Sequence, residues 1–150
     1  MEDRHLCKAR PIGTRKQWVT GFYAVLGEKT VIIVNEPEKF YDVDSEKNSH
    51  GNKIVEVIPK TVCQCTGLKD KKGKLIWEND IVDGHIKRGA AFRNCVVLWN
   101  ECKARFDIRA VDCNFPMTLD ECVDDISVGG LDYEVLGNKF DNPELLEVRL

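Results

Sequence analysis

The 150-residue sequence contains no run of about 18 apolar residues, so we expect no membrane-spanning helix. The N-terminal segment 1–5 is mostly polar and lacks the apolar core of a secretory signal peptide. There is no Cys-x-x-Cys pair and no motif of a phosphate loop, a dinucleotide-binding fold or a zinc protease. We therefore expect a cytoplasmic protein with no cofactor and no bound metal ion.

An odd number of cysteines, seven, together with the missing signal peptide, indicates reduced thiols. Cys63 and Cys65 are two residues apart, which on a strand places both side chains on one face. Two such thiols are half of a zinc site, which Cys95, Cys102 or His85 would complete. The simpler interpretation is that they are small buried apolar residues.

Charge is abundant but nearly balanced, with a net charge of −3, which argues against a protein that binds polyanions over its whole surface. The first half of the chain is basic and the second half acidic. This asymmetry is typical either of two halves that complement each other within one fold or of a protein that binds a partner or a second copy of itself.

Short β-branched segments bounded by turn residues predict a mostly β fold. In the N-terminal part, residues 17–26 and 30–34 form a predicted hairpin around the turn 27–29, and Gly21 indicates a bulge or a close approach of backbone. Further strands are predicted at 39–43 and 53–58. Pro59 marks a boundary between possible subdomains 1–59 and 60–150 of a single compact domain.

In the C-terminal part, the segments 61–66 and 75–77 predict a hairpin, and the segments 95–99, 104–109 and 131–136 predict further strands. Their length and spacing are typical of a small SH3-like barrel packed on the N-terminal β subdomain. In 104–109, apolar side chains alternate with Arg105, Asp107 and Arg109, which predicts one buried and one solvated face.

Two short helices are predicted, one from the capping box of Thr118 and Glu121 and one from Asn142 followed by Pro143. The acidic residues of the first helix are interpreted as a solvated face because they lack the spacing of a calcium loop.

The predicted hairpin 61–77 has a basic tip, and a polar turn follows it. Both are candidates for contact with a partner. A solvated tip is the simpler interpretation of the lysines. The candidate contact residues are Lys69, Lys71, Lys72, Lys74, Glu78, Asn79 and Asp80.

Aromatic residues in the predicted strands, beside these lysines, leave open a second function, the binding of single-stranded nucleic acid by stacking. Packing in the core and between strands is the simpler interpretation. The aromatic residues concerned are Trp18, Phe22, Tyr23, Trp77, Trp99, Phe106 and Tyr133.

Three segments resemble the YopX-like family of phage and prophage proteins. Residues 61–82, TVCQCTGLKDKKGKLIWENDIV, resemble the family wording T-V-G-Q-Y/F-T-G-L-K-D-K-N-G-K-x-I-Y/F-E-G-D-I-V. Residues 8–21, with their W-V-x-G ending, resemble the family's opening, and residues 134–146, EVLGNKFDNPELL, resemble its close. The resemblance implies a β-rich fold and a phage or prophage source, and it assigns no catalytic residue.

The sequence departs from the family wording at Cys63, Cys65 and Asn79, where the family has glycine, an aromatic residue and glycine. A zinc- or thiol-dependent site at these cysteines would therefore be peculiar to this member. Together these features predict a non-enzymatic protein that binds a protein partner or itself in the host cytoplasm.

Overall fold

The computed structural model describes residues 2–13, 17–35, 46–47, 52–86, 91–111, 117–119 and 131–147, and these residues are almost all in strands and turns. None of the helices in these ranges is long and apolar enough to cross a membrane. The elements are η1 (Glu2–His5), β1 (Cys7–Ala9), β2 (Val19–Leu26), β3 (Lys29–Val34), β4 (Glu46–Lys47), β5 (Lys53–Glu56), η3 (Pro59–Thr61), β6 (Cys63–Lys69), β7 (Leu75–Trp77), β8 (Asp80–Ile86), β9 (Ala91–Asn100), β10 (Arg105–Ala110), β11 (Met117–Thr118), β12 (Leu131–Asn138) and η4 (Pro143–Leu146).

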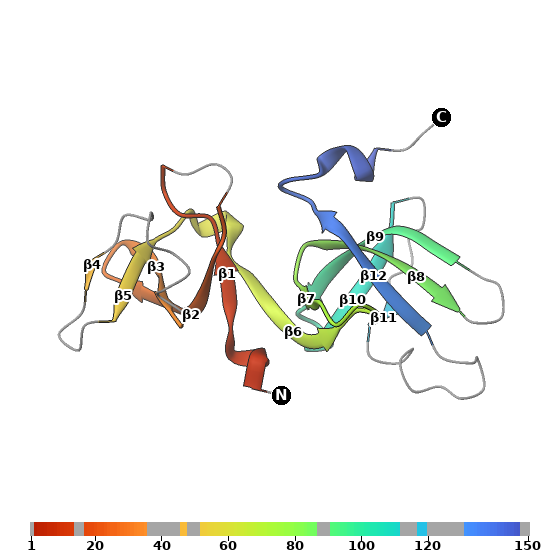
Figure 1. The fold of residues 1–150 in the computed structure, drawn as a ribbon, viewed down its shortest axis with the longest axis horizontal. Coiled ribbons are helices and arrows are strands. Elements are labelled where there is room, and N and C mark those ends of the chain that lie inside the picture. The colour runs from red at the N-terminus through yellow and green to blue at the C-terminus, as the bar shows by residue number, and fades with distance from the viewer. Residues whose placement is uncertain are drawn as a thin grey trace. The chain divides into compact units, whose positions relative to one another are not determined.

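The contacts divide the chain into two compact units, Met1–Cys65 and Thr66–Leu150, and the division falls within β6 (Figure 1). This boundary lies shortly after Pro59, which begins the turn η3. The mostly β fold is confirmed. The prediction of subdomains 1–59 and 60–150 stays a prediction.

The first unit is an antiparallel sheet with the strand order β4-β5-β3-β2-β1-β6. The predicted hairpin is present as β2 and β3, whose register runs without a break from Gly21–Val34 to Leu26–Lys29. The buried core of this unit consists of Ala9, Val19, Ile32, Val34, Val55 and Val57.

Gly21 allows the two strands of this hairpin to approach closely. A Cβ atom at this position would collide with the carbonyl oxygen of Ile33. The predicted close approach is therefore confirmed, and the uninterrupted register excludes a bulge at this point of the β2–β3 pair.

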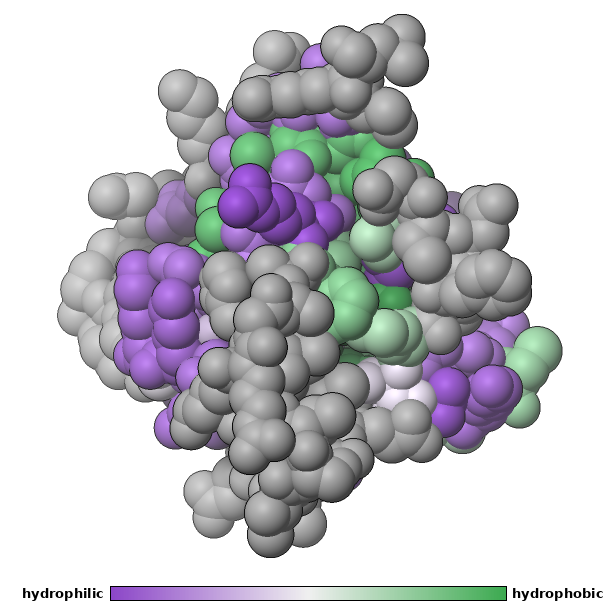
Figure 2. Space-filling model, turned by 90° about the vertical axis from the view of Figure 1, so that its right-hand side faces the viewer, coloured by the Kyte–Doolittle hydropathy of each residue, from purple (hydrophilic) through white to green (hydrophobic). Residues whose placement is uncertain are grey.

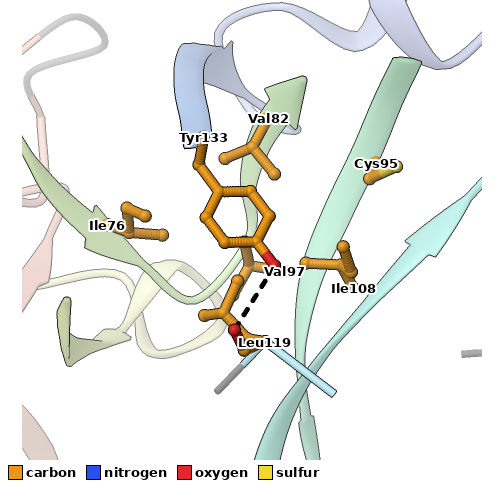
Figure 3. Close-up of a cluster of buried hydrophobic side chains, with 7 residues drawn as sticks. All are labelled: Ile76, Val82, Cys95, Val97, Ile108, Leu119 and Tyr133. Carbon is orange, nitrogen blue, oxygen red and sulfur yellow. Dashed lines mark hydrogen bonds between the residues drawn. The ribbon is translucent and has the colours of Figure 1, made fainter. Parts of the chain in front are cut away.

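The second unit contains the hairpin of β6 and β7 and an antiparallel sheet with the order β11-β10-β9-β8-β12. One side chain of β7, Ile76, joins buried side chains from the five-stranded sheet in a single core (Figure 3). Tyr133 lies among them, and its hydroxyl donates a hydrogen bond of 3.3 Å to the carbonyl oxygen of Leu119. The polar end of the ring is thereby satisfied inside an apolar cluster.

Several finer predictions need correction or lie outside the described residues. The described strands of the second unit form no closed barrel, and the SH3-like arrangement stays a prediction. Thr118 lies in β11, and the helix predicted to follow it, with its acidic residues, is outside the described ranges, as is the predicted strand 39–43. The C-terminal helical turn begins after Asn142 as predicted, but it is the short η4, and Asn142 makes no side-chain cap to it.

The predicted alternation in β10 is confirmed for Phe106 and Ile108, which pack in or against the core, and for Arg109, which is exposed. Asp107 is the exception, because only 1% of it is exposed. Its carboxylate accepts hydrogen bonds from Nε of Arg105 and Nδ2 of Asn100. These two donors compensate the burial of a charge on a face that the sequence predicts to be solvated.

Candidate interaction surface

The tip of the β6–β7 hairpin is fastened to β12 by Asp70, a residue of the predicted basic tip. One carboxylate oxygen of Asp70 accepts hydrogen bonds from the N–H groups of Lys72 and Lys74, both at 2.9 Å. The other accepts one from the N–H of Val135 at 3.1 Å. The N–H of Lys71 also donates to the carbonyl oxygen of Tyr133. The tip is therefore held as part of the fold.

The environment of Asp70 stabilises its charged form. Burial acts to raise the pKa of Asp70, but the N–H donors of Val135, Lys74 and Lys72 and the charge of Lys74 outweigh it, so that the pKa lies below the usual value of 3.8. A carboxylate that accepts three backbone donors is a structural anchor of the turn.

Two of the four lysines at the tip form ion pairs within the molecule. Nζ of Lys71 and Nζ of Lys72 each lie 2.9 Å from a carboxylate oxygen of Glu134 on β12. Hydrogen bonds and charge from these lysines lower the pKa of Glu134. Lys69 and Lys74 are exposed. The basic surface offered to a partner is therefore smaller than the sequence suggests.

The turn Glu78–Asp80, predicted as part of the same surface, is mostly interior. Only 7% of Asn79 and 2% of Asp80 are exposed. Oδ2 of Asp80 accepts a hydrogen bond from the N–H of Trp77, and the backbone of Asn79 bonds to Val97 and Lys139. These two residues thus hold the turn in place and do not present a contact surface.

Asn79 also explains one departure from the family wording. Its φ is +68°, in the left-handed region that favours glycine, and asparagine is among the side chains that tolerate this region best. The glycine expected here and the asparagine present satisfy the same backbone requirement.

The cysteines of the suggested zinc site that lie in the described strands are buried. Cys63, Cys65 and Cys95 are each at most 1% exposed, and the thiol of Cys63 donates to the carbonyl oxygen of Thr61 at 3.2 Å. Within the described ranges, no group of three or more cysteine, histidine or acidic residues could hold a metal ion. Their burial supports packing as the role of these thiols.

Three of the aromatic residues that the sequence offers for stacking are buried or contact charged side chains of the chain itself. Trp77 and Tyr133 are buried and cannot stack on bases. Trp18 has Nζ of Lys8 5.0 Å and Cζ of Arg10 5.2 Å from its ring centroid. Such cation–π contacts use the ring within the molecule. No specific feature of these residues favours a nucleic-acid site over packing.

A shallow cavity of about 250 Å³ lies on β9 and β10, lined by Leu98, Asn100, Asp107 and their neighbours. The carboxylate of Asp107 already accepts hydrogen bonds from Arg105 and Asn100. On the face shown in Figure 2, hydrophobic residues form patches separated by hydrophilic ones.

The clearest candidate site is an apolar surface, of which the sequence predicts only Phe22 and Tyr23 as candidates, and those for stacking on bases. Near the turn of the β2–β3 hairpin, four large apolar side chains are each about half exposed, and we call them the apolar edge. They are Phe22 (48%), Tyr23 (50%), Val25 (57%) and Leu26 (50%). The signal that could have found them is the stretch 17–27, which contains no charged residue in a chain that is 31% charged.

The comparisons with known proteins agree with the resemblance seen in the sequence. The model of a family described as YopX protein matches residues 25–147. This range covers most of the chain, including the hairpin tip, the turn 78–80 and the C-terminal segment that ends in η4. No curated protein matches the sequence.

Proposed function

Because the chain belongs to the YopX protein family, we propose that it is a non-enzymatic, phage- or prophage-encoded protein that binds a protein partner in the host cytoplasm. The binding surface is the apolar edge of β2. The observation that carries this proposal is the half exposure of Phe22, Tyr23, Val25 and Leu26, four neighbouring large apolar side chains on one short hairpin.

Exposed apolar side chains gathered in this way are typical of interaction sites, because burying them against a partner removes apolar area from water. Complete burial of one such side chain stabilises by about 1.5–3 kcal/mol relative to full exposure, so each half-exposed residue offers roughly half of this. Two of the four are aromatic, and aromatic residues are enriched at the centres of protein interfaces.

The arrangement of the polar residues in the second unit also supports a role without catalysis. In the segment that carries the family resemblance, Asp70 and Asp80 hold backbone N–H groups of turns, and Lys71 and Lys72 pair with Glu134. These groups stabilise the fold of the hairpin tip and of the turn that follows it.

A site-specific photo-crosslink tests the proposal. Tyr23 is replaced by p-benzoylphenylalanine in the full chain, expressed in its native cells and irradiated. We expect a discrete protein adduct. The matched control carries the same group at Lys69, which is exposed on the other unit, and should give no such adduct. Equal adducts at both positions, or none at position 23, would refute the assignment of the surface.

A further inference from the structure

The strand β2 is paired along only part of one side. Its pairing with β1 covers Val19–Gly21 and ends at the pair Cys7–Gly21, whereas its pairing with β3 continues to Leu26. The chain before β1 continues along β6, because the carbonyl oxygen of Leu6 accepts a hydrogen bond from the N–H of Cys65. In the described part of the chain, no strand therefore pairs with the β1 side of Phe22–Leu26.

The register shows which backbone groups face this side. In an antiparallel pair, hydrogen-bonded and non-hydrogen-bonded residues alternate. The carbonyl oxygen of Thr20 accepts a hydrogen bond from the N–H of Asn35 at the end of β3, so the even-numbered residues of β2 bond toward β3. Tyr23 and Val25 therefore direct their N–H and C=O groups away from β3, in the direction in which Gly21 meets β1.

The usual protection of a sheet edge is missing here. Natural edge strands are commonly shielded by lysine, proline, a bulge or an inward-pointing charge. The segment 17–27 contains no charged residue and no proline, and the β2–β3 register has no bulge. Tyr23 and Val25, whose backbone groups point away from β3, also have two of the most exposed large apolar side chains in the described residues. An extended strand could add to this edge without a charge to repel it.

We infer that the partner of the apolar edge is a second copy of this chain, whose Phe22–Leu26 segment pairs antiparallel with the same segment across a two-fold axis at Ala24. The inference rests on the proposed function and specifies its partner. A two-fold interface requires one patch to complement itself. This segment does so, because it is uncharged throughout and like charges never come opposite each other.

The position of the axis follows from the backbone groups. With the axis at Ala24, Tyr23 of each copy lies opposite Val25 of the other copy. Each of these two pairs exchanges two backbone hydrogen bonds, so that about four hydrogen bonds join the two strands. Phe22 then lies opposite Leu26 of the second copy, an apolar pair. Gly27, the residue that comes nearest β1 of the other copy, has no side chain, and the turn leads the chain away toward β3.

Disulfide formation tests the axis directly. At a non-hydrogen-bonded antiparallel pair, the Cα atoms lie about 4.5 Å apart, within the range that a disulfide spans. In a parent chain with the exposed Cys102 replaced by serine, we expect Ala24→Cys to form a reducible species of twice the 17.1 kDa chain mass. This disulfide should form at least about ten times faster than the one in Val25→Cys, because the two cysteines at position 25 would be diagonal rather than directly opposite neighbours across the two strands.

A second variant pair separates backbone pairing from apolar contact. Val25→Pro removes an N–H that faces outward and spares the β2–β3 bonds, and Val25→Ile keeps both the N–H and the apolar side chain. Sedimentation velocity between about 1 and 100 μM should show dimers of the parent and of Val25→Ile, with Val25→Pro dissociating at least about tenfold more readily. If circular dichroism shows that the proline variant is unfolded, Val25→Lys, at a site 57% exposed, replaces it.

Two results would overturn the inference. One is a parent that stays monomeric throughout this concentration range. The other is a disulfide that forms at Val25→Cys and not at Ala24→Cys, which would place the axis elsewhere. In either case, a photo-adduct of Tyr23 with a different protein would still support the proposed binding function. Absence of any adduct would refute that function as well.

Discussion

Replacement of Asp70 by alanine should cost more stability than any other single substitution at the hairpin tip. Its carboxylate holds the N–H groups of Lys72, Lys74 and Val135 at 2.9, 2.9 and 3.1 Å. Two of these donors belong to the turn itself, and the third belongs to β12, 65 residues away. The side chain thus joins the local turn to the five-stranded sheet.

The expected magnitude follows from these three bonds. A hydrogen bond to a charged group contributes about 1.5–3 kcal/mol, but water can replace the carboxylate at the exposed turn. We expect Asp70→Ala to lower the free energy of unfolding by about 3 kcal/mol. Asp70→Asn, which keeps one acceptor oxygen, should lower it by about 1–2 kcal/mol.

The assay is urea denaturation of the purified chain, followed by circular dichroism at several pH values. Because the pKa of Asp70 is lower in the folded protein, its contribution is fully present above the usual value of 3.8 and is lost as the pH falls through the folded value. The difference between the parent and Asp70→Asn should therefore shrink below about pH 4.

The exposed Asp132 on β12 provides the matched control. Asp132→Ala should change the free energy of unfolding by less than about 0.5 kcal/mol. Equal effects of Asp70→Ala and Asp132→Ala, or a difference between the parent and Asp70→Asn that is unchanged at low pH, would refute the assignment of Asp70 as the anchor.

Three further predictions concern backbone and packing. Gly21→Ala should lower stability by about 1–3 kcal/mol, because the added Cβ meets the carbonyl oxygen of Ile33, and an unchanged melting temperature would contradict the close approach. Asn79→Gly should leave the free energy of unfolding nearly unchanged while Asn79→Ala lowers it by about 1 kcal/mol, and equal denaturation curves would argue against a left-handed residue there. Cys63→Ala together with Cys65→Ala should lower the melting temperature without altering the zinc content of the purified protein, and stoichiometric zinc in the parent alone would revive the metal site.

The local elements of this protein were predictable where turn residues and side-chain alternation agree. The hairpin of β2 and β3 follows from two β-branched segments around Gly27, whose φ is +63°. The hairpin of β6 and β7 follows from alternation at residues 61–66 and the turn ending in Gly73, whose φ is +81°. In both, the information lies within a few neighbouring residues.

The contact surface was predicted less well, because its residues were judged by charge alone. Lysines in a turn are usually solvated, but Lys71 and Lys72 lie beside Glu134, which comes from a strand more than 60 residues later in the chain. Asp107 was assigned to a solvated face because it alternates with Phe106 and Ile108, but it is buried with Arg105 and Asn100. Glu134 and Asn100 lie on other strands than the residues they bind, so the spacing of residues within one strand cannot reveal them.

The sequence by itself determined that the chain is mostly β, where its turns lie, that Gly21 marks a bulge or a close approach of backbone, and that the chain resembles the YopX-like family, of which it is a member. Such properties depend on local steric preferences and on the alternation of apolar residues. Only the tertiary structure decided that Asp70 is an anchor and that the β1 side of Phe22–Leu26 lacks a paired strand. Both depend on which distant segments become neighbours, and the burial of apolar area and the pairing of backbone groups over the whole fold determine that arrangement.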